Sequence, residues 1–147
     1  MSAPFAIDPA TGRLRFPDLD LDLTPGMPQA AFISATSRLN RDNLGANNGW
    51  QRYSMRELIS GDRKLGLFLI FFDGRLNKLS FAWSQKDETW DDWSEASEAA
   101  RQREYQRAID SQLGGSSEFP WGRISVIQDH KSGGTDIWID CSPAKKP

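Results

Sequence analysis

The most apolar stretch of the chain is Leu65–Trp83, with the sequence LGLFLIFFDGRLNKLSFAW. In its first half apolar residues occupy both alternating faces of a strand, with Leu65, Leu67, Leu69 and Phe71 on one face and Phe68, Ile70 and Phe72 on the other. A strand that is apolar on both faces is usually central in its sheet or covered on both sides. We therefore expect this stretch to organise the fold, and its second face to be covered by residues 1–49 or by another chain.

The dipeptide Asp73-Gly74 predicts a hairpin turn. A two-residue loop would place Lys78 opposite Leu69, on the core face. A three-residue loop, Asp73–Arg75 with Gly74 in a left-handed conformation, avoids this, because a slip of one residue moves every side chain to the other face. The pairs expected in the favoured register are Leu69 with Leu79, Leu67 with Phe81, and Leu65 with Trp83.

Shorter patterns predict further elements on both sides of this hairpin. Residues 5–16 read as two extended pieces around a turn, and Pro28 fits the start of a short helix. Residues 16–23 alternate leucine with aspartate, the period of a half-buried strand that would carry Asp18, Asp20 and Asp22 on its outer face. The Asn- and Gly-rich residues 38–49 are interpreted as a mobile loop, and residues 50–55 as a short strand. Residues 121–128 and 135–141 predict a second hairpin.

One long helix is expected over residues 92–113. Asp91 or Asp92 suits its first turn, where carboxylates are favoured by the helix dipole, and Gly114-Gly115 suits its C-terminal end. Its inner stripe is Glu98, Tyr105, Ile109 and Leu113. A carboxylate in such a stripe calls for a partner, and we expect Glu98 to pair with Arg101 or with backbone donors where the helix meets the sheet.

These elements together predict an α+β fold in a single domain, residues 1–147. We expect an antiparallel sheet of about five to seven strands with the long helix packed across one face. Residues 1–49 supply N-terminal strands, a short helix and a loop, residues 50–141 form the sheet–helix–hairpin core, and residues 142–147 form a tail. The chain length suits one domain, because two would each have a poor core.

Composition and charge narrow the class of partner. A net charge of −2 argues against nucleic acid, which needs a basic field. The longest apolar run is too short to span a bilayer, and the N-terminal residues lack the pattern of a secretory signal, so we expect a cytoplasmic protein without membrane contact.

Candidate chemistry is sparse. The single histidine, His130, is placed in a predicted hairpin tip, and the single cysteine, Cys141, at the far end of the same strand pair, so they are not expected to meet. The spacing of Asp18, Asp20 and Asp22 resembles a calcium loop, but the required glycine and twelfth-position carboxylate are missing. No nucleotide-binding motif occurs. We expect no catalytic residue, no metal site and no cofactor.

Tryptophan beside carboxylates is typical of an anchor in a protein interface. Three groups are therefore candidates for binding a partner: Asp18, Asp20 and Asp22; Trp90, Asp91 and Asp92; and Asp136, Trp138 and Asp140. The residues expected to be structural are Gly74, Trp83, Glu98, Arg101 and Trp121.

The order of motifs in residues 50–141 resembles a known kind of protein. The motifs are Phe72-Asp73-Gly74, Leu79-Ser80-Phe81, Trp90-x-x-Trp93-Ser94, Glu98-x-x-Arg101, Phe119-Pro120-Trp121-Gly122, Asp129-x-Lys131-Ser132-Gly133 and Ile137-x-Ile139. This order resembles small bacterial immunity proteins encoded beside polymorphic toxins of the contact-dependent, Rhs or type VI kinds. The resemblance implies an α+β fold, no enzymatic activity and tight binding to one cognate toxin or effector. It transfers no site residue.

Two other interpretations remain open. One is a small hydrolase that uses carboxylates, drawn from residues such as Asp87, Glu88 and Glu95, with or without a metal. The other is a homo-oligomeric adaptor that uses the second apolar face of Leu65–Phe72. A monomer and a homodimer are both compatible with the sequence.

Overall fold

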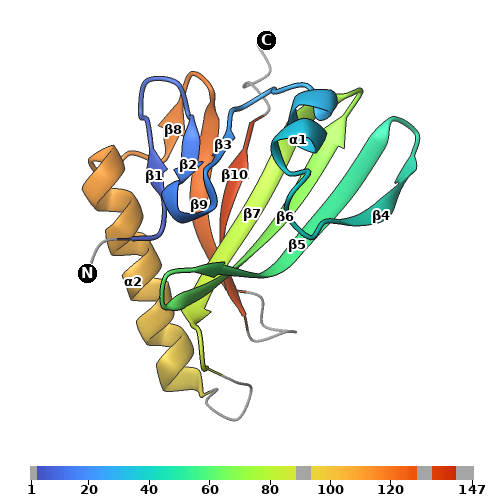
Figure 1. Ribbon diagram of the computed structural model, residues 1–147. Coiled ribbons are helices and arrows are strands. Elements are labelled where there is room, and N and C mark those ends of the chain that lie inside the picture. Colours follow the sequence, from blue (N-terminus) through green and yellow to red (C-terminus); the bar gives the residue numbers. More distant parts are fainter. Residues whose placement is uncertain (1–2, 89–93, 129–133, 142–147) are drawn as a thin grey trace.

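Figure 1 shows the computed structural model of the protein, which describes residues 3–88, 94–128 and 134–141. The described elements are β1 (Ala6–Ile7), β2 (Leu14–Phe16), the 3-10 helix η1 (Pro17–Leu19), β3 (Leu21–Leu23), α1 (Gln29–Ala35), β4 (Asp42–Asn47), β5 (Trp50–Ser60), β6 (Arg63–Phe72), β7 (Arg75–Gln85), α2 (Glu95–Leu113), β8 (Glu118–Phe119), β9 (Gly122–Gln128) and β10 (Thr135–Asp140).

The strands form two antiparallel sheets. The larger sheet has seven strands in the order β4-β5-β6-β7-β10-β9-β8, and the smaller has three in the order β1-β2-β3. The expected α+β fold, with one long helix on an antiparallel sheet of seven strands, is confirmed. The N-terminal strands were expected, but their pairing into a separate small sheet was not.

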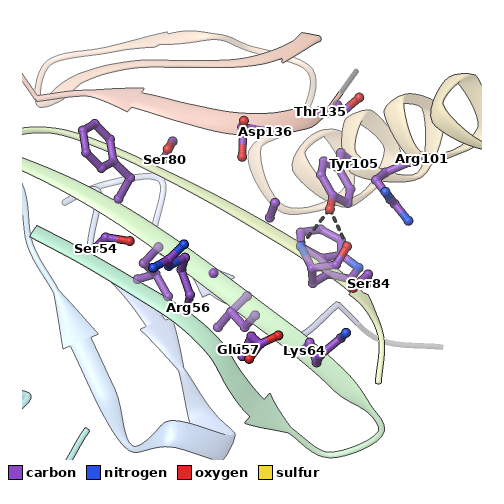
Figure 2. Close-up of a pocket in the computed structure, with 17 residues that line it drawn as sticks. Ser54, Arg56, Glu57, Lys64, Ser80, Ser84, Arg101, Tyr105, Thr135 and Asp136 are labelled. Atoms are coloured by element: carbon purple, nitrogen blue, oxygen red, sulfur yellow. Dashed lines mark hydrogen bonds between the residues drawn. The ribbon is translucent and has the colours of Figure 1, made fainter. Parts of the chain in front are cut away.

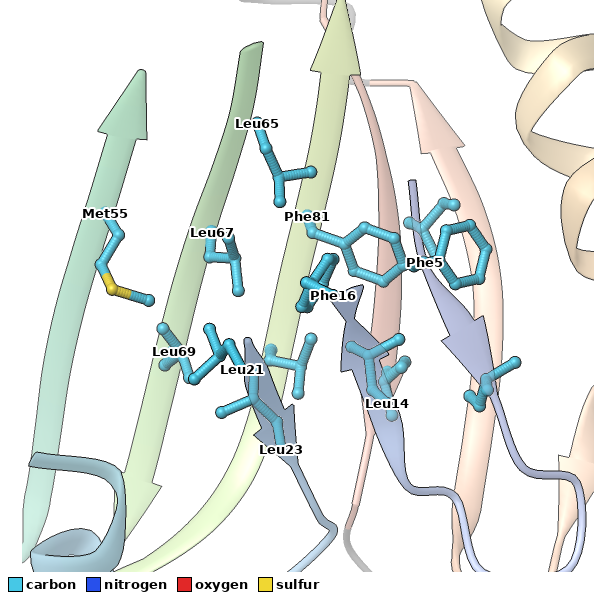
Figure 3. Close-up of a cluster of buried hydrophobic side chains, with 14 of the residues drawn as sticks. Phe5, Leu14, Phe16, Leu21, Leu23, Met55, Leu65, Leu67, Leu69 and Phe81 are labelled. Atoms are coloured by element: carbon cyan, nitrogen blue, oxygen red, sulfur yellow. The ribbon is translucent and has the colours of Figure 1, made fainter. Parts of the chain in front are cut away.

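One face of the large sheet carries the core. The small sheet, α1 and α2 all lie on this side (Figure 1), and side chains from both sheets interdigitate between them (Figure 3). Phe5 and Phe16 of the N-terminal segment meet Phe81 of β7 with ring centroids 5.0 and 5.4 Å apart. The described residues before β4 therefore cover the face of β6 that carries Leu65, Leu67 and Leu69, and not the face of Phe68, Ile70 and Phe72.

The β6–β7 hairpin has the expected register but a different turn. Leu69 pairs with Leu79, Leu67 with Phe81, and Leu65 with Trp83. Phe72, however, pairs with Arg75, so the loop is the two-residue Asp73-Gly74, with φ of 52° and 79°. These angles suit the left-handed turn that joins twisted strands. A register shift after Ile70 then leaves Asn77 as an extra residue, and this bulge moves Lys78 off the core face.

We predict that Gly74→Ala costs about 1 kcal/mol of unfolding free energy, because an L side chain is disfavoured at positive φ. The cost should come from the backbone alone, since a methyl group there meets no described atom within 4 Å. Gly66→Ala is the matched control, because Gly66 has no positive φ and its added methyl would make only ordinary contact with the Met55 carbonyl, 3.8 Å away. Urea denaturation measures both, and equal losses would contradict the assignment.

Residues 16–23 do not form one strand, so that prediction is wrong. Pro17–Leu19 form η1, Asp20 has a left-handed backbone with φ of 48°, and only Leu21–Leu23 are strand. Proline at the first helical position favours a turn, and this local preference breaks the alternation. Leu19, Leu21 and Leu23 are nevertheless all buried, as the pattern predicts.

Two other predictions need correction. The expected mobile loop at residues 38–49 contains β4, an edge strand whose six residues are all exposed and which therefore lacks an apolar signal. The following strand runs from Trp50 to Ser60, five residues beyond the expected end.

Helix α2 begins later than expected, at Glu95. Ser94 caps it: its Oγ accepts a hydrogen bond from the Ser97 N–H at 3.0 Å, and the Ser97 Oγ accepts one from the Ser94 N–H at 2.9 Å. This reciprocal cap satisfies two otherwise unpaired donors. The inner stripe of Glu98, Tyr105, Ile109 and Leu113 is buried, and Gly114 ends the helix in a left-handed conformation, both as expected. Asp91 and Asp92 lie outside the described residues.

Candidate functional site

The second face of the large sheet is not covered by any described element, and we call it the open face. Cross-strand pairs define two rows across it. One row is Arg52, Ile70, Lys78, Asp140 and Arg123, and the next is Ser54, Phe68, Ser80, Trp138 and Ser125. Trp50 and Phe72 form a further pair at one end, and Lys64 pairs with Ser84 at the other.

The row that contains Ser54 has two aromatic residues, Phe68 and Trp138, at its centre and is extended on the β4 side by Asp42, which pairs with Ser54. Phe68 and Trp138 meet edge to face, with ring centroids 6.2 Å apart and an interplanar angle of 76°. At the end of the sheet Trp50 and Phe72 lie 4.5 Å apart, and both side chains are about two-fifths exposed, at 41% and 43%. Exposed aromatic side chains flanked by polar residues are typical of interface centres.

Two hollows, each of about 450 Å³, flank the Phe68–Trp138 pair. The first hollow lies above Gly66 and Ala82, and Arg56, Lys64 and Asp136 are among its lining residues (Figure 2). The second hollow lies over β9 and β10. Lys78, Ser125, Ile127, Trp138 and Asp140 are among its lining residues.

Small side chains and a bulge create the first hollow. Gly66 pairs with Ala82, so the centre of the sheet carries almost no side-chain volume there. On the other side of Gly66, β5 bulges between Met55 and Leu58, and Glu57 has a φ of 56°. Bulges re-aim side chains and concentrate near functional sites, and a non-glycine residue in this conformation stores strain. The bulge places Arg56 and Glu57 at the rim of the hollow.

At the inner end of the first hollow, strands β7 and β10 separate and are no longer hydrogen-bonded to each other. β7 and β10 pair from Lys78 to Phe81, and beyond this point Trp83 bonds to a helix residue instead. Its N–H donates to the Tyr105 hydroxyl at 2.7 Å, and this hydroxyl donates to the Trp83 carbonyl at 2.5 Å. Tyr105 thus takes the place of a strand partner (Figure 2).

Tyr105→Phe should cost about 1–3 kcal/mol of unfolding free energy, because it leaves the buried Trp83 N–H and carbonyl without this partner. Burial raises the pKa of the Tyr105 phenol well above its ordinary value. The folded state therefore favours the protonated phenol. The contribution of the Tyr105 phenol to stability is complete below pH 10, which is about the pKa of tyrosine in the unfolded chain, and it is lost as the pH rises further. The difference between wild type and variant should shrink in urea titrations above pH 10, and a difference independent of pH would contradict this account.

A buried ion pair from α2 lies beside the point where β7 and β10 separate. Glu98 is 1% exposed, and its two carboxylate oxygens accept from Arg101 Nη1 and Thr135 Oγ1, each at 2.8 Å. Arg101 also pairs with Glu88. The expected Glu98–Arg101 pair is confirmed, and it joins α2 to β10 and to the segment after β7.

The other residues expected to be structural lie in the core or at its edge. Trp83 is buried against Tyr105, with ring centroids 4.1 Å apart, and its indole donates to Glu104 at 3.1 Å. Trp121 stacks on Phe119 and donates to the Pro9 carbonyl at 2.9 Å. It therefore ties the second hairpin to the N-terminal segment.

Of the three candidate partner-binding groups, the structure places one on the open face. Asp136, Trp138 and Asp140 occupy alternate positions of β10 there. Trp90, Asp91 and Asp92 lie outside the described residues.

The remaining group, Asp18, Asp20 and Asp22, is not the uniform acidic row that was expected. Arg15 of β2 bonds to both Asp20, at 3.2 Å, and Asp22, at 3.0 Å, while Asp18 accepts from the Ser60 hydroxyl at 3.0 Å. The hydrogen bond from Arg13 lowers the pKa of Asp22 below its ordinary value. Arg13 and Arg15 therefore offset the charges of Asp20 and Asp22, whereas the partner of Asp18 is uncharged.

The described residues bear on two kinds of catalytic site, a cysteine nucleophile and a metal centre. Cys141 is buried, and burial raises the pKa of its thiol to about 12, which disfavours the nucleophilic thiolate at neutral pH. Among residues 3–88, 94–128 and 134–141, no three side chains of the metal-binding types gather as a ligand set. His130 lies outside these ranges.

Sequence reasoning missed the basic and small residues of the first hollow: Arg56, Lys64, Gly66 and Ala82. One signal was present, since a glycine within a run of large apolar strand residues marks a bulge or a close approach. The β5 bulge itself has no comparable signature.

Comparisons of the sequence with protein-family models, with curated proteins and with solved structures gave no match. In the described part of the chain, neither helix combines the length and the apolar character needed to cross a bilayer.

Proposed function

We propose that this protein is a non-enzymatic binding protein, an immunity protein that neutralises a cognate bacterial toxin by occluding it in the cytoplasm. The observation that carries the proposal is the open face, where the aromatic row of Phe68 and Trp138 lies between two hollows. An uncharged aromatic centre with a charged rim is the usual composition of a specific protein interface.

The arrangement of the rest of the molecule supports binding rather than chemistry. The thiol of Cys141, which a cysteine-based active site would need as its nucleophile, is buried. The carboxylates of Glu98 and Asp22 are engaged in ion pairs with arginine side chains. Occlusion needs only a rigid surface, and a seven-stranded sheet backed by one continuous core supplies it.

Co-expression with the product of the neighbouring open reading frame tests the proposal. We expect that product to arrest growth alone, and this protein to restore growth and to co-purify with it. Trp138→Ala should abolish rescue, because truncating a central interface tryptophan costs 2 kcal/mol or more, roughly a thirtyfold loss of affinity. Ile33→Ala is the control, because it removes a 38% exposed apolar side chain from α1, which lies on the other side of the large sheet (Figure 1). A neighbour that is not toxic, or is toxic without binding this protein, would refute the proposal.

The oligomeric interpretation makes a separate prediction. If the open face joined copies of this chain, the purified protein would be a dimer that Trp138→Ala converts to a monomer. Under the proposed function the free protein leaves this face available, and native mass spectrometry should show the same oligomeric state for wild type and variant.

A further inference from the structure

The second hollow, over β9 and β10, is bordered by a row of charged side chains whose signs alternate. Cross-strand pairs place them in line on β7, β10, β9 and β8, and all four line the hollow: Lys78, Asp140, Arg123 and Glu118. Arg123 lies 3.7 Å from Asp140, but its side chain is 66% exposed, so a ligand can still reach its guanidinium. A charged ligand of either sign would be attracted and repelled together, because two cations and two carboxylates share the row.

An aromatic side chain lies beside this charged row, between two serines. Trp138 pairs with Ser80 on one neighbouring strand and with Ser125 on the other. Trp138 and Ser125 both line the second hollow, and Phe68 packs against the indole edge to face, with 6.2 Å between ring centroids. The second hollow therefore combines one aromatic surface with hydrogen-bond donors and acceptors, all held on paired strands of one sheet.

We infer that the second hollow binds a neutral saccharide, with a sugar ring packed on Trp138 and its hydroxyls bonded to the alternating charged row. A sugar ring carries C–H groups on its flat faces, and these suit the electron-rich face of an indole. Each hydroxyl both donates and accepts, so neighbouring hydroxyls can accept from the cations of the row and donate to its carboxylates. A volume of about 450 Å³ is within the usual range for small-ligand sites, roughly 300–1,000 Å³.

Two other classes of ligand fit this hollow less well. An apolar ligand would displace water from four charged side chains and return no hydrogen bond to them, which is costly. A nucleic acid would place phosphates beside Asp140 and Glu118, and these carboxylates oppose the positive field that phosphate binding needs. A neutral saccharide meets neither cost, because it is uncharged and its hydroxyls replace the hydrogen bonds of the displaced water.

The test uses the full chain labelled with ¹⁵N and a panel of trisaccharide probes. The neutral probes are maltotriose, cellotriose and triacetylchitotriose; the charged probes are trigalacturonate, which is anionic, and deacetylated chitotriose, which is cationic. We expect at least one neutral probe to shift the indole signal of Trp138 and the amide signals of Ser125 and Asp140, with a dissociation constant of about 1 mM or lower. The affinity should not change with salt, because the probe is uncharged. The overturning results are unshifted signals with every neutral probe at ten times that concentration, or stronger shifts with a charged probe.

Three variants locate the binding. Trp138→Ala should weaken binding of the responding probe about tenfold or more, because it removes the stacking surface. Trp50→Ala is the matched control, because it removes another tryptophan of the open face, 41% exposed, from outside the lining of the second hollow. Arg123→Ala should weaken binding about threefold or more through loss of a donor, and its exposed side chain can be removed without disturbing the core. Equal affinity of the two tryptophan variants, or wild-type affinity of Arg123→Ala, would overturn the inference.

The saccharide inference goes beyond the proposed function and does not rest on it, because saccharide binding is measured on this chain alone. If the neighbouring gene product is neutralised but no neutral probe binds, the inference fails and the toxin proposal stands. If a neutral probe binds through Trp138 and the neighbouring product is harmless, the toxin proposal fails and the saccharide inference stands.

Discussion

Replacing Phe81 by alanine should lower the free energy of unfolding by about 3–5 kcal/mol. Phe81 is 1% exposed, and its ring contacts Phe5 at 5.0 Å, Phe16 at 5.4 Å and Trp83 at 6.3 Å between centroids. It therefore connects the large sheet to the small one, and its removal leaves a cavity that the two rigid sheets cannot close. Urea denaturation measures the loss.

Phe72→Ala is the matched control, because it removes the same side chain from the neighbouring strand. Phe72 is on the open face, 43% exposed, and touches Trp50. Its loss should cost less than about 1 kcal/mol, as is usual for exposed positions. If the two variants lost similar stability, the small sheet would not be packed on the Phe81 face as described.

Arg101→Ala should also cost about 3–5 kcal/mol, because it leaves the buried Glu98 carboxylate without its cation. The Glu98 side chain retains only the Thr135 hydroxyl at 2.8 Å, and Glu88 loses its partner as well. Thermal and urea unfolding at pH 7 measure it.

Two variants test whether the loss comes from the uncompensated charge. Arg103→Ala, on an exposed position of the same helix, should change stability by less than about 0.5 kcal/mol. The double variant Glu98→Gln/Arg101→Ala should recover part of the loss, because the neutral amide is less costly to bury without a cation. A double variant that is less stable than Arg101→Ala would show that packing of the arginine stem is the main contribution.

Local sequence signals predicted the elements that have a clear hydrophobic periodicity or a typical helix-capping residue. The inner stripe of α2 and its glycine end follow from helical spacing. The register of the β6–β7 hairpin followed from keeping Lys78 off the core face. The structure reaches this register with a two-residue turn and a bulge at Asn77 rather than with a three-residue loop. The burial of Leu19, Leu21 and Leu23 followed from alternation even though the backbone there is partly helical.

Features that depend on contacts between distant segments were not predictable. The exposed strand β4 has no apolar pattern and exists because β5 offers it an edge. The pairing of Asp20 and Asp22 with Arg15 depends on β2 lying beside β3. The candidate site shows this most clearly, since Arg56, Lys64, Gly66 and Trp138 come from three strands and meet only because of the strand order.

The sequence by itself determined the fold class and the central hairpin with its apolar pairs, since these follow from periodicity and side-chain volume along one segment. It also predicted a cover on Phe68, Ile70 and Phe72, which no described element supplies. The tertiary structure decided which face residues 1–49 cover, and so which face remains open. It also decided that the open face carries the Phe68–Trp138 pair between two hollows. The physical reason is that the packing of the small sheet and α1 on one face, and the strand order that assembles the other face, are set by contacts between distant segments, which no local pattern encodes.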